Sequence, residues 1–232
     1  MLIQLLKKLW HLIILLVAPR RRAEFVTRLK YREAHYQGAT YTRLDRFPRL
    51  FAQAAMLLKP IDNPKVVSFG CSTGEEVFSL AKYIPHAQIT GVDINKWCLA
   101  RAKEQNTNRK LSFIHRNSAA YSALLNIDAV FCLAVFQRTE NRVNEINEIT
   151  EGLTFEKFEN ELFILDKKLK IGGFLFIDHS DFSFEDTIIA CRYVAHEFDQ
   201  SKRYRERPLF GKDNTLIAKN HVMQRVFRKQ KH

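Results

Sequence analysis

The residues best suited to ligand chemistry form a glycine-containing turn at residues 70–74, Gly-Cys-Ser-Thr-Gly. Residues 66–69 before it indicate a short buried strand. The residues after it indicate a helix, with apolar side chains at helical spacing at Val77, Leu80, Ala81 and Ile84. Glycine allows positive φ and close approach of a ligand, and the first N–H groups of a helix lack partners. The pattern therefore predicts a ligand-binding lip at the start of a βαβ unit.

Three ligand classes compete for such a turn. A dinucleotide site requires G-x-G-x-x-G, but Ser72 and Glu75 replace two of its glycines, and Glu75 and Glu76 add negative charge where a pyrophosphate binds. The turn matches the G-x-S-x-G of serine hydrolases, but that fold places several strands before its nucleophile, and residues 1–64 indicate helices. The third ligand is S-adenosylmethionine (SAM), whose ammonium and sulfonium groups are compatible with nearby carboxylates.

An acid follows the next predicted strand, residues 88–93. Asp93 lies 19 residues after Gly74, where a carboxylate can accept hydrogen bonds from ribose hydroxyls. With this acid, roughly residues 60–180 resemble the class I SAM-dependent methyltransferases, and the turn GCSTGEE is most similar to that of the chemotaxis-receptor protein carboxyl methyltransferases. The resemblance implies an α/β fold with a doubly wound, seven-stranded, mostly parallel Rossmann-like sheet behind a helical N-terminal segment.

The resemblance also implies SAM as the cofactor and a set of contacts at the carboxyl ends of the strands. We expect Gly70, Ser72 and Gly74 at the methionine end, Asp93 at the ribose and Asn117 at the adenine. The remaining expected contacts are Cys71, Glu75, Ile94, Ser118 and Leu133. Four scattered cysteines without a C-x-x-C pair argue against a metal site or a disulfide framework and for a reducing, cytoplasmic location.

Catalytic candidates are His179 and Tyr41. His179 follows a predicted strand at residues 174–177, and histidine is the residue type whose unperturbed pKa suits a general base; a hydrogen-bonded structural histidine is the alternative. Tyr41, Arg43 and Arg46 lie in the N-terminal segment that commonly covers the cofactor in such methyltransferases, or on a solvated helix. Because positioning supplies much of the catalysis of methyl transfer, a dedicated base is optional.

The positive charge is concentrated at the two ends of the chain. The formal net charge is +12, yet residues 1–60 hold 12 Lys and Arg against 3 acids and residues 201–232 hold 10 against 2, which leaves 15 basic and 20 acidic residues between them. Basic flanks suit RNA, anionic lipid or an acidic substrate, and also an ordinary solvated surface.

The N-terminal segment has its own pattern. Residues 2–17 are apolar except for Gln4, Lys7, Lys8 and His11, which share one helical face. Sixteen residues span about 24 Å, too short for a bilayer. We expect either an interfacial helix on an anionic membrane, peripheral to its inner face, or a helix that packs on the domain or on a second subunit in a homodimer.

These observations predict three parts: an amphipathic helix at 1–22, a helical cap at 23–60 and a SAM-binding methyltransferase domain at 61–232. Further strands are expected at 111–115, 128–133 and 222–229, with a helix at 153–169. The predicted function is SAM-dependent methyl transfer to a small molecule. Protein carboxylates, RNA, and a non-catalytic SAM-binding regulator are the alternatives.

Overall fold

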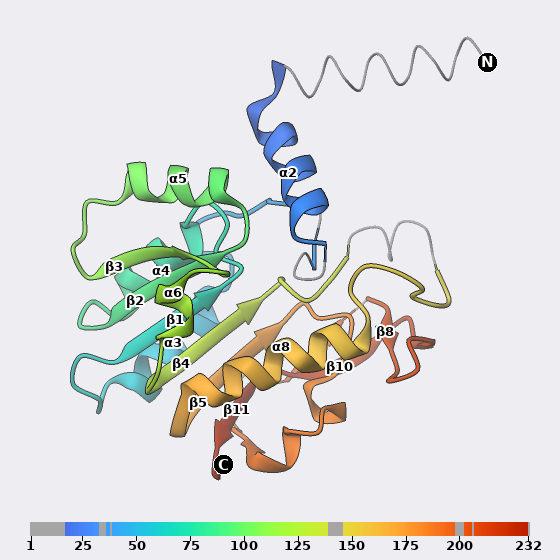
Figure 1. Ribbon diagram of the computed structural model, residues 1–232. Helices are drawn as coiled ribbons and strands as arrows, with labels where there is room; N and C mark the ends of the chain where they lie inside the picture. The colour runs from blue at the N-terminus through green and yellow to red at the C-terminus, as the bar shows by residue number, and fades with distance from the viewer. Residues whose placement is uncertain are drawn as a thin grey trace.

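The computed structural model describes residues 17–32, 36–37, 39–138, 146–197, 202–205 and 207–231. These residues include one seven-stranded sheet (Figure 1). In spatial order its strands are β3 (Leu111–His115), β2 (Gln88–Asp93), β1 (Lys65–Phe69), β4 (Ile127–Leu133), β5 (Leu169–Asp178), β11 (Val226–Lys229) and β6 (Tyr193–Ala195). The strands from β3 to β5 run parallel, and β11 is antiparallel to both its neighbours. The predicted fold class is confirmed.

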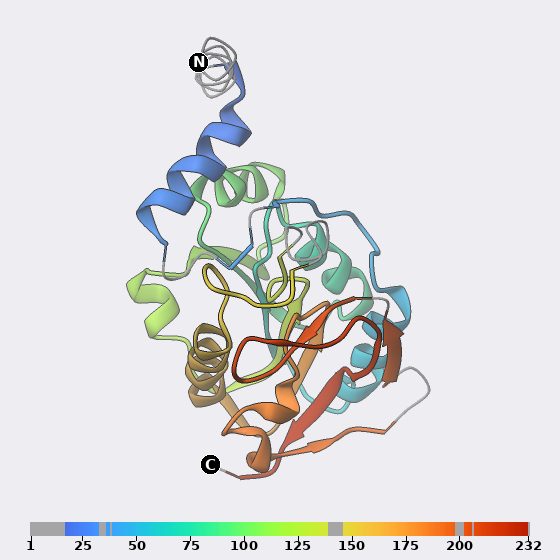
Figure 2. The same cartoon turned by 90° about the vertical axis from the view of Figure 1, so that its right-hand side faces the viewer.

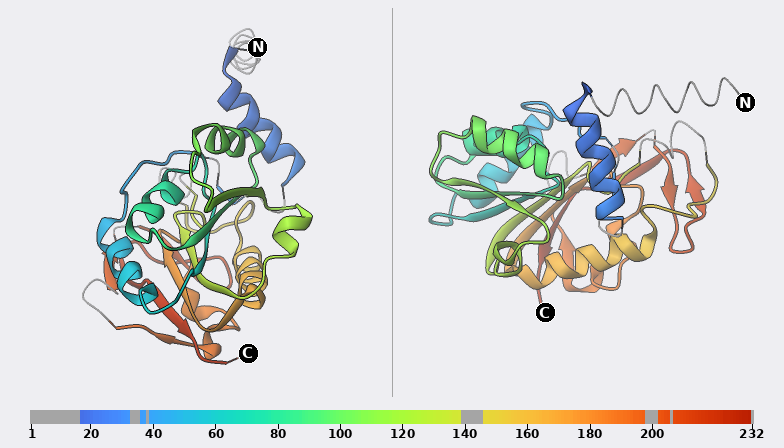
Figure 3. Two further views of the ribbon diagram at one scale, coloured as in Figure 1. Left: turned by 90° about the vertical axis from the view of Figure 1, so that its left-hand side faces the viewer. Right: turned by 45° about the horizontal axis from the view of Figure 1, so that its top comes forward.

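Helices cover both faces of the sheet (Figure 3). One core packs α3 (Pro48–Leu58), α4 (Glu75–Tyr83) and α5 (Lys96–Gln105) against strand residues such as Val66 and Phe131. The other core packs α6 (Ala119–Ser122) and α8 (Phe155–Lys168) against Val67 and Val130. Because strand side chains alternate between faces, adjacent residues serve different cores, and all seven residues of β4 are buried.

The N-terminal helices cross the predicted domain limits. Helix α2 (Pro19–Lys30) runs through the limit at residue 22, and α3 places Phe51 and Leu58 in the same core as β1, beyond the limit at residue 60. Helix α2 therefore continues past the first predicted limit, and α3 shares a hydrophobic core with the strand that follows the second. Residues 1–16, most of the predicted amphipathic helix, lie outside the described residues. Within the described ranges, no helix is long and apolar enough to cross a bilayer.

The carboxyl-terminal part adds small elements between β5 and β11 (Figure 2). These are η1 (Phe184–Asp186), η2 (Ala190–Arg192), β7 (Lys202–Arg205), β8 (Leu209–Phe210), β9 (Leu216–Ala218) and β10 (His221–Gln224). The single strand predicted at 222–229 divides at Arg225, because β10 pairs with β7 in a separate sheet while β11 enters the main sheet.

Candidate functional site

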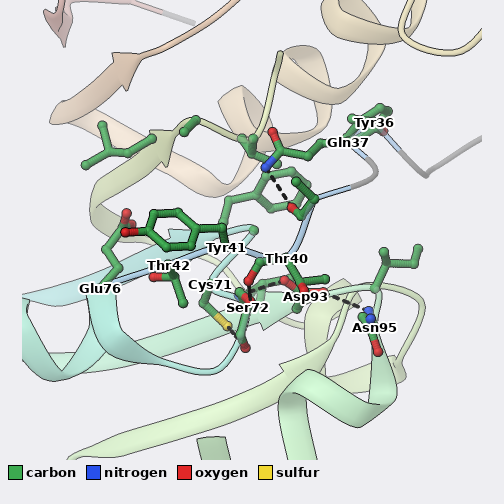
Figure 4. A pocket seen from close by; sticks show the side chains of 18 of the residues that line it. Tyr36, Gln37, Thr40, Tyr41, Thr42, Cys71, Ser72, Glu76, Asp93 and Asn95 are labelled. Carbon is green, nitrogen blue, oxygen red and sulfur yellow. Dashed lines mark hydrogen bonds between the residues drawn. The ribbon is translucent and has the colours of Figure 1, made fainter. Parts of the chain in front are cut away.

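A cavity opens at the carboxyl edge of the sheet (Figure 4). It lies where the strand order reverses between β1 and β4, the position at which open α/β sheets bind ligands. Its empty volume, including the open mouth, is about 970 Å³. The walls come from the turn after β1, the ends of β2 and β4, helix α2 and the segment at residues 36–46.

The turn after β1 requires glycine at its first position. Gly70 has a φ of +79°, and its N–H donates to the carbonyl of Val92 at 2.8 Å, which joins the turn to β2. A Cβ added there would lie 2.6 Å from Cγ2 of Val135, another residue of the cavity wall. Glycine therefore keeps this part of the cavity open and lets a ligand approach the backbone.

Asp93 is fixed at the end of β2 by two backbone donors. Its Oδ2 accepts from the Ser72 N–H at 2.8 Å, and its Oδ1 accepts from the Asn95 N–H at 2.7 Å. Burial raises the pKa of Asp93, and these hydrogen bonds oppose the rise. A carboxylate has about four acceptor sites, so Asp93 keeps acceptor capacity for hydroxyl donors beyond these backbone bonds. This arrangement suits a ligand with a pair of adjacent hydroxyls.

Glu76 and Arg46 place a buried carboxyl group and a guanidinium on the cavity wall. Oε1 of Glu76 accepts from the Ser68 hydroxyl at 2.8 Å, and burial raises the pKa of Glu76 to about 8. Burial lowers the pKa of Arg46, whose guanidinium lies 5.3 Å from the centre of the Phe47 ring. Each residue favours the charged form of the other. A ligand group that carries both an ammonium and a carboxylate complements this pair.

The segment at residues 36–46 closes the cavity from the N-terminal side. Ser72 Oγ donates to the carbonyl of Thr40 at 2.8 Å, and the Tyr36 hydroxyl donates to Oε2 of Glu161 at 2.6 Å. Thr40 Oγ1 in turn donates to Oε1 of Glu24 on α2 at 2.5 Å. The wall is therefore tied both to the glycine turn and to α2.

Glu161, on helix α8, anchors this wall through its hydrogen bonds. Arg116 donates to both of its oxygens, from Nε to Oε1 at 2.8 Å and from Nη2 to Oε2 at 2.7 Å. The Tyr121 hydroxyl donates to Oε1 at 3.1 Å. Burial, followed by the charge of Glu161, raises the pKa of Tyr36 and of Tyr121. The buried carboxylate of Glu161, which is 2% exposed, therefore keeps both phenols protonated and the wall in place.

Replacing Glu161 by Gln is expected to lower the free energy of unfolding by about 3–5 kcal/mol, because a partly buried guanidinium loses its counter-charge. Chemical denaturation monitored by circular dichroism measures the change. The matched control is Glu156→Gln, at an exposed position of the same helix, with an expected change within about 0.5 kcal/mol. Equal stability of the Glu161→Gln variant and the wild type would show that the pair does not anchor the wall.

Comparison with known proteins identifies the central part of the chain. Residues 66–154 match the model of a family described as a methyltransferase domain. A trans-aconitate 2-methyltransferase of Rhodopseudomonas palustris BisB18 is 32% identical over 95 residues, covering 40% of this chain and 36% of the relative. One from Afipia carboxidovorans is 28% identical over 89 residues, covering 38% and 34%. The chain thus spans about a third of the length of the curated relatives it matches.

Solved structures of methyltransferases are also similar to this chain. The plantazolicin methyltransferase BpumL in complex with SAH gives a TM-score of 0.41 at 16% identity, covering 71% of this chain and 55% of that one. PKMT2 of Rickettsia typhi in complex with AdoHcy gives 0.40 at 18%, covering 55% and 24%. These scores are low, so the fold assignment rests on the strand order. The likeness of the turn to chemotaxis-receptor methyltransferases stays a prediction.

The structure brings many of the predicted site residues together. The cavity is lined by Gly70, Cys71, Ser72, Asp93, Ile94 and Leu133, and by Tyr41, Arg43 and Arg46 from the N-terminal segment. Outside its lining lie Gly74, Glu75, Asn117, Ser118 and His179. Glu24, Tyr36, Gln37, Thr40, Glu76 and Arg116 line it and were missed by sequence reasoning.

Local geometry explains each residue that lies outside the lining. Glu75 accepts from the Thr73 hydroxyl at 2.7 Å, within the turn, while Gly74 begins α4 with a φ of +97°. Ser118 caps α6 by accepting from the Tyr121 N–H at 3.2 Å. Asn117 is exposed, and the neighbouring Arg116 lines the cavity instead. The residue from this loop that lines the cavity is therefore Arg116 and not Asn117, the predicted adenine contact.

His179 is buried and does not line the cavity. Its backbone has a φ of +57°, its ring packs 5.3 Å from that of Phe47, and its Nδ1 lies 3.2 Å from Oδ1 of Asp178. The carbonyl of Asp178 accepts from the N–H of Ala134, a cavity residue, at 2.8 Å. This placement suits a residue that supports the wall rather than one that touches a substrate. Tyr41, the other catalytic candidate, lines the cavity and is 63% exposed.

Proposed function

We propose that this protein is a SAM-dependent methyltransferase that acts on a small molecule. The observation that carries the proposal is Asp93, whose carboxylate is held by two N–H groups and keeps acceptor sites directed to the cavity of a methyltransferase domain. Those sites match the two ribose hydroxyls of SAM. The glycine turn at Gly70 provides the close approach that the cofactor needs.

The other parts of SAM have partners in the same walls. We assign its ammonium to Glu76, whose ionised form an ammonium favours, and its carboxylate to the guanidinium of Arg46. The Ser72 backbone, Cys71 and Leu133 complete the methionine end of the site. Since the cofactor is cationic at sulfur, the acidic side chains that disfavour a pyrophosphate favour SAM.

When bound, SAM supplies an electrophilic methyl group for in-line displacement by the acceptor. The residues of the chain contribute orientation and exclusion of water, which can account for most of such a rate enhancement. The wall at residues 36–46 encloses the site, and Ser72 fixes that wall through Thr40. Tyr41 is the hydroxyl-bearing residue that we place nearest the cavity mouth, where it can orient an acceptor.

We place the acceptor among small, acidic molecules. Arg43 lines the exposed side of the cavity and supplies positive charge that the cofactor does not use in this assignment. The curated relatives are named for trans-aconitate, which is a small molecule, although they match only part of this chain.

The test is transfer of a tritiated methyl group from SAM into a cell extract that is then fractionated into protein, nucleic acid and small molecules. Label in the small-molecule fraction, absent with an Asp93→Ala variant, is the expected result. Label in protein or RNA instead would move the acceptor to those classes. SAM binding without any labelled product would indicate a regulator, and no binding would overturn the proposal.

We further propose that the N-terminal segment attaches the protein peripherally to an anionic membrane surface. Residues 2–22 combine twelve apolar residues at 2–17 with Lys7, Lys8 and the three arginines at 20–22. Of this segment the structure describes residues 17–22, which include the first residues of helix α2.

A further inference from the structure

Helix α2 has two different faces. Arg22, Val26, Leu29 and Lys30 are exposed at spacings of i, i+4, i+7 and i+8 and therefore share its outer face. Val26 is 51% and Leu29 66% exposed. Arg20, Glu24 and Thr27, at i, i+4 and i+7, share the inner face, and Glu24 and Thr27 line the cavity. Figure 2 shows the helix projecting from the domain.

The inner face is connected to the cofactor site by a chain of hydrogen bonds. Arg20 Nε donates to Thr40 Oγ1 at 2.7 Å, and Thr40 Oγ1 donates to Glu24. The carbonyl of Thr40 accepts from the Ser72 hydroxyl, and the Ser72 N–H donates to Asp93. The position of α2 therefore affects the turn and the acid that we assign to the cofactor.

The outer face suits an anionic lipid surface. The helix carries five cations, Arg20, Arg21, Arg22, Arg28 and Lys30, against one acid, Glu24, which faces inward. Cations beside exposed aliphatic side chains are the pattern of helices that lie in the headgroup region. Nucleic acid would leave Val26 and Leu29 without a function, and a second copy of the helix would bring like charges together.

We propose that α2 binds anionic lipid through Arg22, Val26, Leu29 and Lys30, and that this binding strengthens cofactor binding through Thr40 and Ser72. The docking surface stands independently of the cofactor, whereas the coupling rests on the proposed function. Lipid that fixes α2 against the domain also fixes the wall of the cavity. Because coupling between two binding sites is reciprocal, SAM must strengthen lipid binding by the same factor.

The first experiment is flotation of the full-length protein with vesicles of phosphatidylcholine and phosphatidylglycerol, or of phosphatidylcholine alone. We expect binding only to the anionic vesicles, weakened by salt. The double variant Val26→Asp/Leu29→Asp should lose at least about 10-fold in affinity, as expected when apolar burial is replaced by charge repulsion. The control Met56→Asp, at a 67% exposed position on α3, should bind like the wild type. Equal loss in both variants, or retention on RNA but not on vesicles, would overturn the docking surface.

The second experiment measures SAM affinity by calorimetry with and without anionic vesicles. We expect affinity about 5-fold or more tighter with vesicles for the wild type and for Met56→Asp, and no change for Val26→Asp/Leu29→Asp. Equal SAM affinity with and without vesicles would overturn the coupling. If vesicles bind and SAM does not bind under either condition, the proposed function fails while the docking surface stands.

Discussion

Replacing Asp93 by Ala is expected to lower the affinity for SAM by about 100-fold or more, since hydrogen bonds to a charged group contribute about 1.5–3 kcal/mol each and the ribose would lose two of them. The substitution also removes the acceptor for the Ser72 N–H, which holds the glycine turn. Isothermal titration calorimetry with SAM measures the affinity directly.

Two control variants separate binding from folding. Asp93→Asn keeps an oxygen for one backbone donor but loses the charge, so it should fold while still binding SAM much more weakly than the wild type. Asp62→Ala, in an exposed loop, should leave SAM affinity unchanged. If the Asp93→Ala variant binds SAM like the wild type, the ribose contact is assigned to the wrong residue.

Replacing Glu76 by Gln should weaken SAM binding and also reduce its pH dependence. The pKa of Glu76 in the free protein is about 8, and a bound ammonium lowers it because opposite charges favour each other. Binding below that pH therefore releases a proton. Wild-type affinity should rise by up to about 10-fold per pH unit between about pH 5 and pH 7, and the Gln variant should show a smaller rise over that range. Calorimetry in two buffers of different ionisation enthalpy measures the proton release.

The same variant should be more stable than the wild type at alkaline pH. The folded pKa of Glu76 lies above the usual value of 4.5, so its ionisation disfavours the folded state increasingly between those two values. Chemical denaturation should show similar stability of the two proteins at about pH 4 and a more stable Gln variant at about pH 9. If the Gln variant were less stable than the wild type at about pH 9, Glu76 would stabilise the fold rather than serve a ligand.

Local sequence patterns predicted the strands that carry the site. The bounds of β2 and β3 agree with the predictions. Helix α5 begins after Asn95, whose side chain accepts from the N–H groups of Trp97 and Cys98. β5 begins at Leu169, earlier than the predicted residue 174, because a register shift lets Leu169 pair with Ile127 before the main ladder starts. The pairing of Leu169 depends on Ile127 in another strand, so the sequence around Leu169 does not predict it.

The missed site residues depend on contacts between distant parts of the chain. Tyr36 reaches the cavity because Glu161, 125 residues away, holds its hydroxyl. No spacing rule connects two such positions. Glu76 is different: it lies four residues before the buried Leu80 on α4, so the helical period could have placed it on the inward side and distinguished it from Glu75.

A crystal structure of the protein with SAH would show whether Asp93 holds the ribose. We expect the ribose hydroxyls within hydrogen-bonding distance of the Asp93 carboxylate, the amino group at Glu76 and the carboxylate at Arg46. An empty cavity with the adenosine bound elsewhere, or a ribose that leaves Asp93 unoccupied, would contradict it.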